Sequence, residues 1–216
     1  HIRAGLMFEL LNSGGGFMYV ILSASIGALA LFCERAFHLY MRLRLNVDSA
    51  YEKVYACLGK SNYRAALEEC NKIVHHPLGR TLKAGLLKTG KRDKEIEQAM
   101  QESILREAPL LKKRINYLSM FANVATLLGL LGTIVGLIAA FSGVADANPA
   151  EKQEILASGI SVAMFTTAFG LIVSIPCLMG FYLLNNRGDY LIEKIDEKAL
   201  SLFNVLSSLK REGQEQ

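Results

Sequence analysis

The chain has 216 residues, of which 51% are hydrophobic and 20% are charged, and its formal net charge is +4. Such apolar content, gathered into long charge-free stretches, is not typical of a soluble domain. The basic residues are interspersed with acids and lack interleaved aromatic residues, which disfavours a nucleic-acid surface. A nucleotide-binding loop and the common nucleophile–base arrangements are absent from the sequence, so we expect neither an enzyme nor a cofactor.

The N-terminal part predicts one membrane span. Residues 1–14 form a short amphipathic segment that we expect at the membrane interface, and residues 15–40 form the first transmembrane helix. The alternative is a cleavable signal peptide. It is disfavoured because no basic segment precedes the apolar run and no small-residue cleavage site follows it.

Residues 41–114 are rich in Lys and Arg and predict a helical domain on the cytoplasmic side. A zinc site built from its cysteines and histidines is disfavoured because their spacing fits no standard pattern, so we expect no metal. Two short helices are expected at residues 47–60 and 61–74, the second with Ser61 as N-cap. A third covers residues 80–88, after the turn at His76 and Pro77. The last covers about residues 92–143 with Asp93 as N-cap and continues into the membrane, and Pro109 either kinks it or starts a new helix.

Two further spans follow. A helix needs about 20 apolar residues to cross the hydrocarbon core, and the charge-free stretches at residues 115–145 and 156–185 exceed that length. Residues 146–155 form a short external loop, and residues 186–216 form a cytoplasmic C-terminal helix. The sequence therefore predicts an all-α membrane protein with three transmembrane helices and long helical cytoplasmic extensions. Its N-terminus is expected outside and its C-terminus in the cytoplasm.

The second and third spans each carry one stripe of small and hydroxylated residues at steps of three and four. Close helix packing explains the glycines, whereas two facing hydroxyl stripes indicate a shared polar surface. Pro176 is expected to kink the third span. The candidate pore-lining residues are Thr133, Thr167, Thr126, Thr166 and Ser174, and the candidate packing residues are Gly129, Gly132, Gly136, Gly159 and Gly170.

Neither of these two spans contains an acid, a lysine, an arginine or a histidine. Charged groups inside a membrane are costly and are kept for function. If protons cross the membrane here, another protein must supply the group that titrates.

Several motifs resemble the ExbB/TolQ/MotA proton-channel family, and most closely its three-span ExbB/TolQ branch. Residues 129–136, GLLGTIVG, are similar to the family motif G-L-x-G-T-V-x-G, and residues 167–171 with Ile175-Pro176 are similar to T-A-x-G-L…I-P. Glu34-Arg35 resembles the acid–arginine pair after the first span. The segment from His76 through Leu86 resembles a cytoplasmic P-L…A-G-L segment.

The resemblance implies a bacterial inner-membrane protein whose N-terminus and 146–155 loop are periplasmic. It also implies a pentamer around the helices of a dimeric, single-span partner of the ExbD/TolR kind, which carries an intramembrane aspartate. Proton flow would then drive mechanical work on the cell envelope through a TonB/TolA-like or motility effector. Thr133 and Thr167 would line the pore opposite that aspartate. The rival function is a non-conducting membrane scaffold. A small-molecule transporter is disfavoured because three spans without an internal repeat or a broken helix pair lack the usual midplane site.

The sequence departs from the family pattern at two positions. Val162 stands where TonB- and Tol-linked members have a glutamate, five residues before the second threonine, and Thr126 stands where they have proline. The role of that glutamate therefore does not transfer to this chain. Nutrient uptake, Tol-Pal-type constriction and gliding motility all remain open as the process that is powered.

Overall fold

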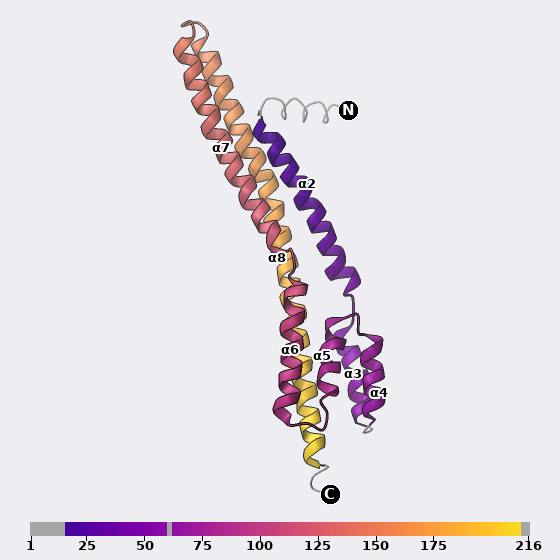
Figure 1. Cartoon of the computed structure of the whole chain (residues 1–216). Helices are drawn as coiled ribbons and strands as arrows, with labels where there is room; N and C mark the ends of the chain where they lie inside the picture. Colours follow the sequence, from indigo (N-terminus) through magenta and orange to yellow (C-terminus); the bar gives the residue numbers. More distant parts are fainter. Residues whose placement is uncertain (1–15, 60–61, 213–216) are drawn as a thin grey trace. The chain divides into compact units, whose positions relative to one another are not determined.

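The computed structural model describes residues 16–59 and 62–212, and every regular element within them is helical (Figure 1). The expected interfacial segment at residues 1–14 and the expected cap Ser61 lie outside the described residues. The elements are α2 (Gly16–Ala36), the π-helix η1 (Phe37–Arg42), α3 (Val47–Leu58), α4 (Tyr63–Lys72), α5 (Pro77–Leu86), α6 (Asp93–Leu111), α7 (Asn116–Asp146) and α8 (Lys152–Glu212).

Three helical stretches among the described residues are long and apolar enough to cross a membrane, which confirms the expected number of spans. They contain α2, α7 and the first half of α8. The chain divides into two compact units. The first holds α2, α7 and α8 up to Leu183, and the second holds residues 36–113 together with α8 from Leu184 onward.

The first unit is built on contacts of α2 with both helices of the α7–α8 hairpin. Ile21 of α2 packs against Ala125 of α7 and Val173 of α8, and all three are buried. The aromatic ring of Phe121 lies beside Gly27, where α2 has no side chain. The small residues at these points let three helices of high apolar content approach closely.

The second unit packs the short helices α3 to α6 around the second half of α8. Buried Leu191, Ile195 and Leu202 lie on one face of α8, at the helical spacing of three to four residues per turn. Polar contacts add specificity to this packing. The Tyr51 hydroxyl of α3 donates to Ser201 at 2.8 Å, and Lys198 pairs with Asp48 at 2.6 Å.

The expected continuous helix over residues 92–143 is wrong, because the chain leaves helical geometry between Leu111 and Asn116. Pro109 lies inside α6 and does not end it. The break centres on Arg114, whose φ of 65° is left-handed. The Arg114 side chain reaches Glu34 of α2 at 3.2 Å, an ion pair between residues 80 positions apart that the local sequence pattern does not reveal.

Two expected helix starts also differ. Asp93 is the first residue of α6, with Arg92 in the cap position; its carboxylate accepts hydrogen bonds from Ser207 and Lys210 of α8. Helix α5 begins at Pro77, three residues earlier than expected, because Nδ1 of His76 accepts from the Leu78 amide and caps the helix. In α4 the cap is supplied by Asn62.

Candidate functional site

Helices α7 and α8 run side by side as a hairpin (Figure 1), and glycines set their separation. A Cβ atom on Gly170 would lie 2.7 Å from the Ala125 carbonyl oxygen and 3.1 Å from the Gly129 Cα. A Cβ atom on Gly129 would in turn lie 3.2 Å from the Thr166 carbonyl oxygen. Both neighbours are backbone atoms that cannot swing away, so alanine at either position would push the two helices apart, and by more at Gly170 than at Gly129.

The close approach brings the hydroxyl groups of the two helices together in two pairs. The Thr126 hydroxyl of α7 donates to Ser174 Oγ of α8 at 2.8 Å. Two turns away, the hydroxyls of Thr133 and Thr167 are hydrogen-bonded to each other. Thr167 also donates to the Gly129 carbonyl at 3.0 Å. We call these four residues the hydroxyl edge.

The hydroxyl edge and the α2 contacts lie on opposite sides of the α7–α8 interface. At about 100° per residue, Thr133 lies roughly 120° around α7 from the residues that face α2, and the α8 contact lies between them. Thr167 holds the equivalent position on α8. Helix α2 therefore covers one side of the interface and leaves Thr126, Thr133 and Thr167 of the hydroxyl edge at least partly exposed within the described part of the first unit. Ser174, the fourth member, is 4% exposed and lies beneath Thr126.

The hydroxyl groups can still accept hydrogen bonds. Each has one proton to donate and two lone pairs that accept. The Thr133 hydroxyl has three acceptors for its one proton: Thr167, and the Gly129 and Ala163 carbonyl oxygens, each at 3.2 Å. Whichever acceptor takes the proton, lone pairs of Thr133 stay available. Both threonines are partly exposed. The edge can thus accept hydrogen bonds from water or from a protonated carboxylic acid, but it contains no group that titrates.

Thr166 occupies a different environment from its neighbour. Its side chain is 1% exposed, and its hydroxyl donates to the Ala163 carbonyl of its own helix at 2.7 Å. It packs against Gly132, where an added Cβ would lie 2.8 Å from the Thr166 hydroxyl oxygen. Thr166 is therefore a packing residue inside the hairpin, and a partner helix cannot reach it without separating α7 from α8.

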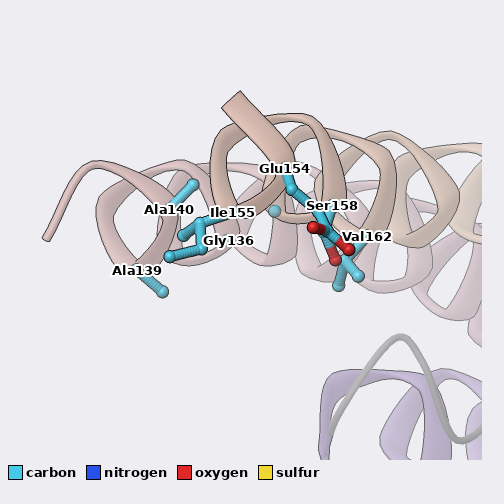
Figure 2. Close-up of a pocket in the computed structure, with 8 residues that line it drawn as sticks. Gly136, Ala139, Ala140, Glu154, Ile155, Ser158 and Val162 are labelled. Atoms are coloured by element: carbon cyan, nitrogen blue, oxygen red, sulfur yellow. The ribbon is translucent and has the colours of Figure 1, made fainter. Parts of the chain in front are cut away.

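A pocket of about 480 Å³ lies farther along the hairpin, toward the α7–α8 turn (Figure 2). Val162 is one of its lining residues. Val162 precedes Val173 by eleven residues, which is about three helical turns. It therefore lies on the same face of α8 as Val173, the face that packs on α2. The position at which the family motif has a glutamate is therefore not on the hydroxyl edge. The lining residues are Gly136, Ala139, Ala140, Glu154, Ile155, Ser158, Gly159 and Val162.

Apart from Thr166, which packs inside the hairpin, the candidate residues have three kinds of surroundings. Thr126, Ser174, Thr133 and Thr167 form the hydroxyl edge. The five glycines all meet the opposite helix of the hairpin; for example, Gly136 faces Ala163 and Gly159 faces Ala140. Pro176 lies within the uninterrupted helix α8, beside an apolar groove between α2 and the hairpin.

Sequence reasoning missed the ion pair that closes one end of this unit. Glu34 accepts from Arg114 at 3.2 Å and from Arg35 at 3.0 Å. The Arg35 side chain is buried, with 8% of its surface exposed. The signal was present, because an acid and an arginine directly follow an apolar span, but their partner lies 80 residues away.

The fold is that of a helical membrane protein with three candidate spans. Two of these spans are held together by glycines and by hydroxyl groups. A profile of the MotA/TolQ/ExbB proton channel family matches residues 71–197, which is more than half of the chain. The chain belongs to this family.

Individual relatives agree with the family. A putative ExbB-like 3 biopolymer transport protein from Synechocystis is 30% identical over 168 residues, covering 77% of this chain and 79% of the relative. A putative ExbB homologue from Methanothermobacter thermautotrophicus is 28% identical over 89% of this chain and 67% of its own. The biopolymer transport protein exbB1 of Vibrio cholerae is 39% identical, but only 42% of this chain and 40% of the relative are matched.

Proposed function

We propose that this chain is the channel-forming subunit of a proton-driven motor in a bacterial inner membrane. Several copies, five in the arrangement that the family suggests, surround the membrane helices of a dimeric, single-span partner of the ExbD/TolR kind. The N-terminus is periplasmic and the C-terminus cytoplasmic, as the basic residues between the first two spans favour. Proton flow is converted into mechanical work on an envelope partner.

The observation that carries this proposal is the uncovered hydroxyl edge in spans that hold no charge. Threonine hydroxyls accept hydrogen bonds without binding a proton permanently, so a neutral carboxylic acid can slide past them. A fixed acid in the same place would compete for the proton. The partner's intramembrane aspartate is therefore the proton carrier, and Thr133 and Thr167 form the polar surface it passes.

The roles of the other candidate residues follow from their contacts. Thr126 and Ser174 extend the same polar surface by two turns. The glycines keep the hairpin rigid by holding α7 and α8 close together. Pro176 lacks an amide hydrogen, which leaves the Ile172 carbonyl without its helical donor, and gives α8 a point at which it can bend as the partner moves.

This division of labour predicts that the chain alone does not conduct. The purified chain is placed in proteoliposomes that contain a pH-sensitive dye, and a potassium diffusion potential drives protons across the membrane. These vesicles should show no proton flux above that of protein-free vesicles. Vesicles with the co-purified complex of chain and partner should conduct, and replacing the partner's intramembrane Asp with Asn should abolish the flux. Conduction by the chain alone, or full flux with the Asn partner, would contradict the proposal.

A non-conducting scaffold is the second candidate, and one observation favours it. Every hydroxyl of the hydroxyl edge already has a hydrogen-bond partner within the hairpin. In that case the stripes serve packing only, and the intact complex with its wild-type partner would carry no proton flux in the same vesicles. Envelope processes would then depend on assembly of the complex and not on the membrane potential.

A further inference from the structure

The second unit has a groove between α5 and α6 that the proposed pore does not use. The groove has a volume of about 460 Å³ and is lined by four cations but only two acids. Arg80 and Lys83 come from α5, Lys88 from the turn after it, and Arg106 from α6. Leu87, which also lines the groove, is 63% exposed. An exposed apolar side chain among cations fits a partner surface that is acidic and partly apolar.

Two of the four cations keep a charge that the groove does not neutralise. Arg80 and Arg106 each pair with one of the two glutamates of α6 that line the groove. Lys83 is half-buried and Lys88 is exposed, and neither forms an ion pair with a carboxylate of the described residues. The groove therefore offers two free positive charges beside Leu87.

Helix α8 carries the complementary pattern on its outer face. Glu193 and Asp196 are exposed, and Leu200 is 61% exposed. At about 100° per residue, all three lie roughly 100–160° around the helix from the buried Ile195. Neither acid forms an ion pair in the described part of the chain, whereas the neighbouring Glu197 pairs with lysines of its own helix. We call Glu193, Asp196 and Leu200 the outer stripe.

The groove and the outer stripe lie at the same level along the second unit. Helices α6 and α8 are antiparallel, because Lys112 pairs with Asp189 at one end and Asp93 accepts from Ser207 at the other. Since both helices rise by about 1.5 Å per residue, residues at the same level have numbers that add up to about 300. The α6 residues of the groove are therefore level with roughly residues 193–201 of α8, the part that contains the outer stripe.

The order of the side chains also matches. Helices α5 and α6 form an antiparallel hairpin, in which Arg80 binds Glu107 through both carboxylate oxygens at 2.6 Å each. Helix α5 is therefore parallel to the second half of α8. In the same direction, the outer stripe presents acid, acid and leucine, and the groove presents Arg80, Lys83 and Leu87.

The two surfaces of one copy cannot meet each other, because the outer stripe points away from the helices that pack on α8. The groove of another copy can receive it. When one surface of a copy binds a different surface of the next copy, repetition about an axis closes a ring. Such a ring requires the two surfaces to lie at the same level along its axis, as the groove and the outer stripe do.

We propose that the outer stripe of one copy docks in the α5–α6 groove of the next copy, in a ring whose axis runs along α6 and α8. Glu193 and Asp196 then face the cations of the groove, and Leu200 packs against Leu87. The inference rests on the assembly of several copies in the proposed function, and it names the surfaces that join neighbouring copies in the second unit.

The first test links the two leucines by a disulfide bond. The double variant Leu87→Cys/Leu200→Cys of the full chain, with the four native cysteines replaced by Ala, is oxidised in membranes with copper phenanthroline. We expect a ladder of species beyond the dimer, because each copy is bonded to two neighbours. Each single variant alone should stay monomeric. Tyr55→Cys/Leu200→Cys is the matched control, because Tyr55 of α3 is 51% exposed but lies outside the groove, and it should give no ladder.

Each other outcome of this test contradicts the proposal in its own way. Dimers without larger species would indicate a two-fold contact and overturn the ring. No cross-link in a chain that native mass spectrometry shows to be assembled would overturn the docking alone. A wild-type chain that stays monomeric would overturn the docking together with the assembly of the proposed function. Proton flux is not measured, so a failure of the pore assignment leaves these results unchanged.

The second test exchanges charges across the contact, with the yield of the ladder as the readout. Lys83→Glu and Asp196→Lys each place like charges opposite each other and should lower the yield at least about threefold. Their combination restores opposite charges and should return the yield to within about twofold of the unreversed chain. Because Asp196 is exposed, Asp196→Lys serves if Lys83→Glu does not fold.

Lys94→Glu is the matched control for charge, because Lys94 is an exposed cation of α6 outside the groove. It changes the net charge as much as Lys83→Glu does and should leave the yield unchanged. An equal loss in these two variants would overturn the proposal. So would an unchanged yield in Asp196→Lys, or no recovery when the two reversals are combined.

Discussion

The closeness of α7 and α8 can be tested by adding one methyl group at Gly170. In Gly170→Ala the new Cβ would lie 2.7 Å from the Ala125 carbonyl oxygen, whereas carbon–oxygen contacts are normally about 3.3 Å or more. Relieving the contact requires a local shift of about 0.6 Å between two backbones. Overpacking of this kind costs about 1–3 kcal/mol, partly offset by the better helix propensity of alanine, about 0.5–1 kcal/mol.

The expected net effect of Gly170→Ala is a loss of about 1–2 kcal/mol in the free energy of unfolding, measured by titration with sodium dodecyl sulfate in mixed micelles. Gly27→Ala is the matched control, because its Cβ would meet only the Phe121 ring at 3.5 Å, an ordinary contact. That variant should be neutral or slightly more stable than wild type. If Gly170→Ala were as stable as Gly27→Ala, the close approach of the two helices would be refuted.

Two further predictions concern the second unit. Burial, with the charges of Arg80 and Arg187, lowers the pKa of His76 from 6.5 to about 4. Between these two pH values the unfolded chain therefore binds more protons than the folded chain. The free energy of unfolding should be highest above pH 6.5 and should fall by up to about 3 kcal/mol as the pH drops to 4. Unfolding measured across this range should lose that pH-dependent part in His76→Asn, and an unchanged pH dependence would contradict the assignment to His76. In the Arg80–Glu107 pair, Arg80→Met should destabilise the chain more than Glu107→Gln. Arg80→Met leaves the Glu107 carboxylate without its partner charge, and only 7% of that side chain is exposed to water. Glu107→Gln leaves Arg80 without its partner charge, but 38% of the Arg80 side chain is exposed and water can solvate it. Chemical unfolding of both variants gives the comparison, and the reverse order would contradict this reading of the pair.

Much of the membrane part of this fold could be predicted from composition and spacing alone. The three spans follow from charge-free length, and the two stripes follow from steps of three and four residues. Because the helix period is regular, the stripes also predict that Thr133 and Thr167 face a common surface. The structure adds that this surface is the edge of the hairpin not covered by α2, a fact that depends on the position of Ile21 and not on either stripe.

Most of the features that sequence reasoning missed depend on partners distant in the chain, whereas the caps at His76 and Asn62 are local. The break before Asn116 lies in a segment whose apolar period continues, and it involves Arg114, which pairs with Glu34. Asp93 has the sequence signature of a cap but binds Lys210 instead, 117 residues away. A local pattern contains no information about such pairs.

In the proposed function, protons move along the hydroxyl edge. Valine has nearly the shape of threonine, so Thr133→Val and Thr167→Val preserve packing. Each lost hydroxyl should cost about 0.6–2 kcal/mol of helix association in a membrane, too little to dissociate the complex. Thr133→Ser and Thr167→Ser retain the hydroxyl and serve as matched controls, and native mass spectrometry confirms equal assembly of all variants.

The most direct measurement is therefore the proton flux of the double variant Thr133→Val/Thr167→Val, assembled with its partner in proteoliposomes, against the double serine variant. We predict that flux falls at least about tenfold in the valine complex and stays near wild type in the serine complex, while the subunit stoichiometry of both is unchanged. Wild-type flux from a correctly assembled valine complex would contradict the assignment of the hydroxyl edge to the proton pathway.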